Sequence, residues 1–184
     1  MNIFVKRLRD ERGLTLIELI AMLSIMSMVM GTIYGVITFG FNAYHRVTIE
    51  NELRNEGDIL MSSIMTEMYA FGPDSMAPVQ GSDGIKGLAL VKKNDRRYIL
   101  LRPESGGAGY SLYIGDQAGG TGPGQVPLRS KVVQGPKDSN QDSSIVLECS
   151  TEACESGLVS VRAVLSQTYN GGEQTLALQS KFGF

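Results

Sequence analysis

An uncharged run of 26 residues near the N-terminus, Leu19 to Tyr44, constrains this chain more than any other feature. About 20 apolar residues are enough for a helix to cross a bilayer. Residues 1–13 carry four basic and two acidic side chains, and an excess of basic residues holds its end of a span in the cytoplasm. We expect a cytoplasmic leader over residues 1–13, a single transmembrane helix over 14–43, and an extracytoplasmic C-terminal domain.

A secretory signal peptide and a plain uncleaved anchor are the two alternatives for this run. A signal peptide has an apolar core of roughly 7–15 residues that ends at a small-x-small cleavage site. The run here is about twice as long, and no Ala-x-Ala site follows it. Its length favours a span that stays in the chain.

Glu18 places a carboxylate at the front edge of the apolar run. A charge inside a span costs at least ~2.5 kcal/mol, and such residues usually mark function. One interpretation is that Glu18 lies at the membrane interface and reaches polar surroundings. The other is that a cation pairs with it. Geometry alone leaves both open.

The segment Gly13-Leu14-Thr15-Leu16-Ile17-Glu18 resembles the processing site of type IV prepilins and type II secretion pseudopilins. The resemblance implies that a prepilin peptidase cleaves between Gly13 and Leu14 and that Leu14 becomes N-methylated. It also implies that Thr15 and Glu18 serve assembly. Leu14 stands where the family most often has Phe. A methylated amine keeps its charge, so the new terminus can neutralise a Glu18 carboxylate of its own or of a neighbouring subunit.

The resemblance further implies a structural subunit, a minor pilin or pseudopilin. Its length and glycine-rich antiparallel C-terminal portion resemble those of J-type (PilW-like) minor pseudopilins, and competence pseudopilins have the same N-terminal design. Its partners would be membrane lipid, other pilins or pseudopilins that contact the N-terminal helix, the prepilin peptidase and an assembly platform protein. The resemblance also implies that the subunit is inserted in the plasma (inner) membrane and needs no cofactor. After assembly it would belong to a filament for secretion, competence or motility and adhesion. The sequence does not separate these systems.

Two glycines of the span, Gly31 and Gly35, form the small-x-x-x-small pattern of close helix packing in membranes. Gly35 also stands where many family members carry a proline, and glycine allows a local bend.

After Tyr44 the sequence turns polar but keeps helical periodicity. The apolar positions fall within an arc of about 60°, and they are Ile49, Leu53, Leu60, Ile64 and Phe71. We therefore expect an amphipathic continuation over residues 44–72, weakened at Gly57 and ended by Gly72-Pro73. The methionines Met61, Met65 and Met68 are expected to pack in the core; a binding surface is the alternative.

Residues 73–184 are typical of short strands between Gly, Pro, Asn and Asp turns. The expected strands are Gly87–Lys92, Arg97–Arg102, Tyr110–Gly115, Val126–Val133, Ser144–Cys149, Leu158–Gln167 and Gln174–Phe182. Short links, including the hairpin signal Asn170-Gly171-Gly172, predict antiparallel pairing. The expected class is α+β, with a long N-terminal helix packed on a C-terminal antiparallel sheet, and the resemblance makes it type IV pilin-like.

The glycine-rich tract Gly106–Gly124 lacks the ending of a phosphate loop and is expected to form surface loops.

Cys149 and Cys154 are close enough in sequence to form a disulfide on the outer side of a membrane, although two free thiols remain an alternative. Two Cys without a nearby His do not complete a metal site. Asp138, Asn140 and Asp142 alternate like the start of a calcium loop, but Ser143 replaces the turn glycine and Cys149 the closing glutamate, so a solvated turn is the default.

Composition narrows the functional class. A formal net charge of -2 provides no basic field for nucleic acid. The only histidine, His45, has no plausible triad partner in sequence, so we expect no enzyme. The alternative to a filament subunit is a single-span surface receptor or adhesin that does not polymerise.

Overall fold

The computed structural model describes residues 15–81, 83–104, 109–120, 122–135, 142–150, 154–169 and 171–184. Gly13 and Leu14 lie outside the described residues, as do Asp138, Asn140, Asn170 and parts of the glycine-rich tract. The chain divides into two compact units between Arg46 and Val47.

The helix α2 (Leu16–Phe71) contributes to both units and ends at the predicted residue. Gly72 follows it with a φ of 56°, and its N–H donates to the carbonyl of Met68 at 3.0 Å. Glycine adopts this left-handed conformation without a Cβ penalty, so Gly72 caps the helix and Pro73 prevents its continuation.

One face of α2 is buried within the second unit. The predicted stripe is confirmed at Ile49, Leu53, Leu60 and Ile64, which are at most 7% exposed. Phe71, the fifth predicted position, is half-buried and packs against the edge of the core.

Gly57 lies in the middle of this buried face. The sequence shows it as a weak point of the helix, but the structure gives it a packing role. A Cβ at this position would run into the side chain of Leu178. Met61 and Met68 join the core as predicted, whereas Met65 is 39% exposed.

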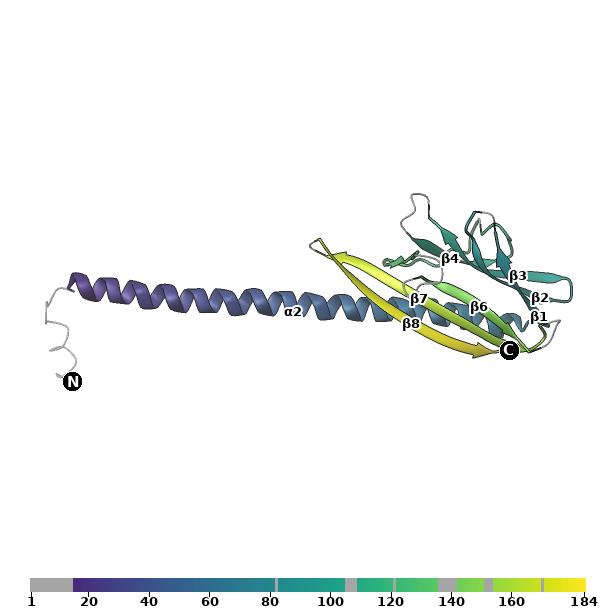
Figure 1. The fold of residues 1–184 in the computed structure, drawn as a ribbon, viewed down its shortest axis with the longest axis horizontal. Coiled ribbons are helices and arrows are strands. Elements are labelled where there is room, and N and C mark those ends of the chain that lie inside the picture. The colour runs from purple at the N-terminus through teal and green to yellow at the C-terminus, as the bar shows by residue number, and fades with distance from the viewer. Residues whose placement is uncertain are drawn as a thin grey trace, which may run out of the picture. The chain divides into compact units, whose positions relative to one another are not determined.

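The described residues form eight strands in one curled sheet whose strand pairs are antiparallel (Figure 1). The strands are β1 (Ser75–Gln80), β2 (Lys86–Lys92), β3 (Asp95–Pro103), β4 (Tyr110–Gly115), β5 (Lys131–Val132), β6 (Ser144–Cys149), β7 (Gly157–Tyr169) and β8 (Gly172–Gly183). Their order is β1-β2-β3-β4-β5-β7-β6, and β8 pairs with β7. The predicted α+β class, a long N-terminal helix packed against a C-terminal antiparallel sheet, is confirmed.

Two strand predictions need correction. Strand β1 was not expected, because its Pro78 removes a backbone donor; β1 is an edge strand, where this loss is tolerated. The expected strand Val126–Val133 pairs as a strand only at Lys131–Val132. The carboxylate of Glu56 instead binds N–H groups in the preceding part of this segment.

The two ends of the curled sheet meet without a ladder between them in the described part of the chain. The N–H of Met76 on β1 donates to the carbonyl of Cys154 at 3.1 Å. The Nζ of Lys86 on β2 lies 2.6 Å from Oδ2 of Asp142, just before β6. These two contacts join the ends of the sheet.

Candidate assembly site

The start of α2 is organised by Thr15 and Glu18. Glu18 Oε2 accepts hydrogen bonds from the backbone N–H and from the hydroxyl of Thr15, each at 2.9 Å. In return, the Thr15 Oγ1 accepts a bond from the N–H of Glu18 at 3.3 Å. This reciprocal arrangement is a capping box, which satisfies backbone donors at the helix start.

The capping box gives Glu18 a local partner that the sequence analysis did not assign to it. The signal was present, because Thr15 and Glu18 have the Thr-x-x-Glu spacing that precedes an apolar run in such boxes. Of the predicted site, the structure brings Thr15 and Glu18 together, while the cleavage position at Gly13 and Leu14 lies outside the described residues.

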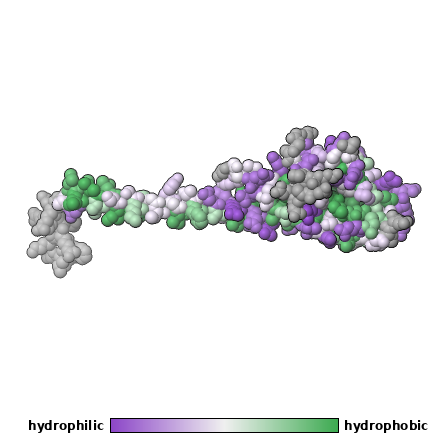
Figure 2. Space-filling view, viewed as in Figure 1, coloured by the Kyte–Doolittle hydropathy of each residue, from purple (hydrophilic) through white to green (hydrophobic). Residues whose placement is uncertain are grey.

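The first unit presents an apolar surface on all sides of the helix. Residues 16–44 are exposed, and the space-filling view shows their surface as mostly hydrophobic or neutral (Figure 2). By length and composition, α2 qualifies as a membrane-spanning helix, and it is the one helix of the described residues that does. The coarse expectation of a single-pass membrane protein is consistent with this finding.

Hydroxyl groups within this apolar stretch bond to the helix itself. Ser24, Ser27 and Thr32 each donate to a carbonyl three or four residues earlier, at 2.8 to 2.9 Å. Polar groups satisfied in this way are compatible with a lipid environment. At Gly31 and Gly35 a Cβ would meet nothing within 4 Å, so both positions remain open to a neighbouring helix.

In the second unit a disulfide joins Cys149 and Cys154, with their Cα atoms 5.0 Å apart. Cys149 ends β6, and Cys154 supplies the carbonyl that binds Met76. The bridge therefore closes the loop that holds one end of the sheet against the other.

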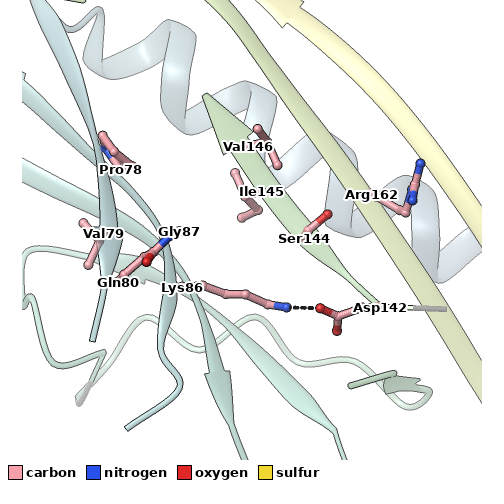
Figure 3. Close-up of a pocket in the computed structure, with 10 residues that line it drawn as sticks. All are labelled: Pro78, Val79, Gln80, Lys86, Gly87, Asp142, Ser144, Ile145, Val146 and Arg162. Carbon is pink, nitrogen blue, oxygen red and sulfur yellow. Dashed lines mark hydrogen bonds and ion pairs between the residues drawn. The ribbon is translucent and has the colours of Figure 1, made fainter. Parts of the chain in front are cut away.

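A surface groove of about 370 Å³ lies between β1, β2 and β6 (Figure 3). Its charged side chains include Lys86, Asp142 and Arg162. Lys86 is paired with Asp142 and lies 4.3 Å from the ring centre of Tyr110. The charges at the Lys86 end of the groove therefore compensate one another.

Asp142 was also a candidate calcium ligand, together with Asp138 and Asn140, which lie outside the described residues. Its Oδ2 binds Lys86, and its Oδ1 accepts the N–H of Gly135 at 3.1 Å. A cation at Asp142 would therefore have to compete with the Lys86 ammonium. The described residues contain no cluster of three metal-binding side chains.

Glu56 is a structural residue that nothing in the sequence around it indicates. Its carboxylate accepts the N–H of Arg129 at 3.0 Å, the N–H of Ser130 at 2.6 Å and the hydroxyl of Ser130. No local pattern announces a contact between residues more than 70 positions apart. These contacts of Glu56 with Arg129 and Ser130, which we call the Glu56 clamp, tie the loop before β5 to the part of α2 that belongs to the second unit.

No protein-family model, curated protein or solved structure matches the chain. The fold and the site define an α+β protein whose N-terminal helix is long and apolar enough to cross a membrane and begins with a Thr15–Glu18 capping box.

Proposed function

We propose that this protein is a minor pilin or pseudopilin, a structural subunit of a type IV pilus-like or type II secretion filament. The chain is inserted through α2 with its N-terminus in the cytoplasm. Prepilin peptidase removes the leader after Gly13, and Leu14 becomes the methylated terminus. The exposed apolar helix then packs against the helices of other subunits, and an assembly platform protein carries the subunit into the filament.

The observation that carries this proposal is the position of the Gly13–Glu18 motif relative to α2. The motif leads into α2, whose first residues are Leu16, Ile17 and Glu18. This helix is exposed over residues 16–44, and its later part is buried in the second unit. Soluble monomeric proteins rarely expose so large a continuous apolar surface. Lipid and then neighbouring helices supply partners for it in turn.

Glu18 has two roles in this proposal. As the cap of α2 it needs an acceptor oxygen, and as a partner for a terminal amine it needs a negative charge. Glutamine fulfils the first role, because Glu and Gln both serve in capping boxes, but it fails the second. The two roles can therefore be separated by mutation.

The processing step is tested by intact mass and N-terminal sequencing of the protein extracted from membranes. A start at methylated Leu14 is the expected result. A start at Met1, or beyond residue 35, rejects the assignment to this class.

The assembly step is tested with Glu18→Gln and its matched variant Thr15→Ala. Glu18→Gln keeps the cap and removes the charge, so we expect filament yield to collapse while membrane insertion persists. Thr15→Ala weakens the cap by about 0.5–2 kcal/mol but keeps the charge, so we expect filaments at reduced or normal yield. Yield is measured by shearing filaments from cells and blotting.

Normal filament yield with Glu18→Gln would contradict the charge-pairing role. If the wild-type chain stays monomeric in the membrane and is displayed equally well with either variant, the alternative holds, and the protein is a single-span receptor or adhesin that does not polymerise.

A further inference from the structure

The aromatic residues at the end of the uncharged run are three rings that the structure leaves largely open. Phe39, Phe41 and Tyr44 are 77%, 61% and 68% exposed. The Tyr44 ring also lies edge-on to the ring of His45, with 6.0 Å between the ring centroids, and still keeps this exposure. These rings therefore have most of their surface available to an outside partner.

The length of the run shows where these rings lie along a membrane normal. At 1.5 Å per residue, the 26 residues from Leu19 to Tyr44 extend about 39 Å, which exceeds a hydrocarbon core of about 30 Å. The twenty residues Leu19–Thr38 already fill about 30 Å. The remaining segment Phe39–Tyr44 has a length of about 9 Å, which fits the polar boundary of the bilayer.

The directions of the rings distinguish lipid from a protein partner. At 3.6 residues per turn, Phe41 and Tyr44 project roughly 200° and 140° away from Phe39 around the helix. The rings thus lie on opposite sides of α2, whereas a docked protein would cover one side. The charged Arg46 lies two residues after Tyr44, and its long side chain can reach lipid phosphates.

We propose that Phe39, Phe41 and Tyr44 form an aromatic girdle that binds the phospholipid headgroup boundary of the outer leaflet and sets the depth of α2. Aromatic rings favour this boundary because they combine an apolar body with a polar or polarisable edge. The girdle places Thr38 at the outer limit of the hydrocarbon and Glu18 at its inner limit. This inference rests on the proposed function only in requiring that α2 crosses a membrane; it requires neither cleavage nor polymerisation.

The chain contains no tryptophan, so each introduced tryptophan is a unique fluorescent probe. Full-length Phe41→Trp is reconstituted in phosphatidylcholine vesicles that carry bromine either near the glycerol end or near the middle of the bilayer. Val29→Trp, at the centre of Leu19–Thr38, is the deep control. Tyr69→Trp, at a position 67% exposed in the second unit, is the control for water.

We expect the Phe41→Trp fluorescence to be quenched more by shallow than by deep bromine, with the order reversed for Val29→Trp and little quenching for Tyr69→Trp. Phe39→Trp, on the opposite side of the helix, should give the same depth as Phe41→Trp. Deep quenching of Phe41→Trp, or none, overturns the girdle. Quenching of Phe41→Trp without quenching of Phe39→Trp also overturns it, because that result indicates a one-sided protein interface.

Failure of the girdle and failure of the filament proposal give different results. Normal filaments with Glu18→Gln reject charge-paired assembly and leave the depth of Phe41→Trp unchanged. If Phe41→Trp does not lie at the shallow depth but Glu18→Gln still abolishes filaments, the girdle alone is rejected.

Discussion

At the scale of single residues, Gly57 sets how closely α2 approaches β8. Replacing a helical glycine by alanine favours the helix by up to about 1 kcal/mol. Here the added Cβ would collide with the side chain of Leu178. Relieving the collision requires the half-buried Leu178 side chain to move away from α2. Overpacking of this kind costs roughly 1–3 kcal/mol, and we expect this cost to exceed the gain in propensity.

We therefore expect Gly57→Ala to lower the free energy of unfolding of the second unit, measured by chemical denaturation of the full chain in detergent. Gly31→Ala is the matched control, since a Cβ there meets nothing within 4 Å. Adding Leu178→Ala to Gly57→Ala should recover part of the loss. A Gly57→Ala protein more stable than wild type would show that Leu178 moves aside without cost.

Glu56 makes a second residue-scale prediction. Glu56→Ala leaves the donors of Arg129 and Ser130 without their acceptor, which costs about 1–3 kcal/mol where such groups are buried. We expect faster hydrogen exchange at these two amides and a lower unfolding free energy.

The control for Glu56→Ala is Glu50→Ala, which breaks an exposed ion pair between Glu50 and Arg54 on the same helix. Such a pair contributes about 0.3–0.5 kcal/mol. Equal effects of the two substitutions would refute a special role for the clamp.

At the scale of elements, the sequence predicted the helix and the strands whose apolar residues repeat at a regular spacing. The stripe on α2 and the strands β2, β3, β4, β6, β7 and β8 are all visible as apolar repeats between turn residues. The segment 126–130 was also expected to be a strand, but Pro127 has no backbone donor and the donors of Arg129 and Ser130 bind the carboxylate of Glu56, which is far away in sequence. Strand β1 contains Pro78, and a proline argues against a strand. At the edge of a sheet this penalty is small, so β1 forms in spite of Pro78. The place of each segment in the sheet, which local composition does not show, decided both exceptions.

The loop closed by the Cys149–Cys154 disulfide contacts strand β1, and removing the disulfide tests this contact. Cys154 has a φ of 51°, a conformation that costs a non-glycine residue about 1–2 kcal/mol, and its carbonyl binds Met76. In the double variant Cys149→Ser/Cys154→Ser the loop can relax. We expect hydrogen exchange at Met76 to accelerate by roughly five- to tenfold, as for a local opening made about 1 kcal/mol easier.

Amides within the long β7–β8 ladder serve as the internal reference for that measurement, because the loop does not support them. If Met76 retains wild-type exchange in the double variant, the bridge does not hold the ends of the sheet together.

At the scale of the whole molecule, the candidate site was predictable in kind and only partly in detail. The motif that ends at Glu18 and the apolar run are each a continuous stretch of the sequence, so the sequence alone was enough to locate them. The Thr-x-x-Glu spacing indicates the capping box, but the expectation for Glu18 considered only its charge. The contact of Lys86 with Asp142 joins residues 56 positions apart and had no local signature.

The division of the chain at Val47 predicts that the second unit has a core of its own. A chain that begins at Val47 keeps every buried residue of α2, and we expect it to be soluble and to unfold cooperatively by circular dichroism. A chain that begins at Asp58 loses Ile49 and Leu53, at a cost of about 2–5 kcal/mol for each large side chain.

If the chain from Val47 aggregates as readily as the chain from Asp58, the second unit depends on residues before Val47. A large difference in melting temperature between the two chains is the result that supports an independent core.

The buried stripe of α2 precedes every strand in the order of synthesis. As the polypeptide emerges, the central surface of the core is therefore complete before any of its cover exists. Leu53, Leu60 and Ile64 remain uncovered until the strands that supply the rest of the core have been made. A chain interrupted before that point would display the stripe to solvent, which makes nascent fragments of this protein natural substrates for chaperones that bind apolar helices.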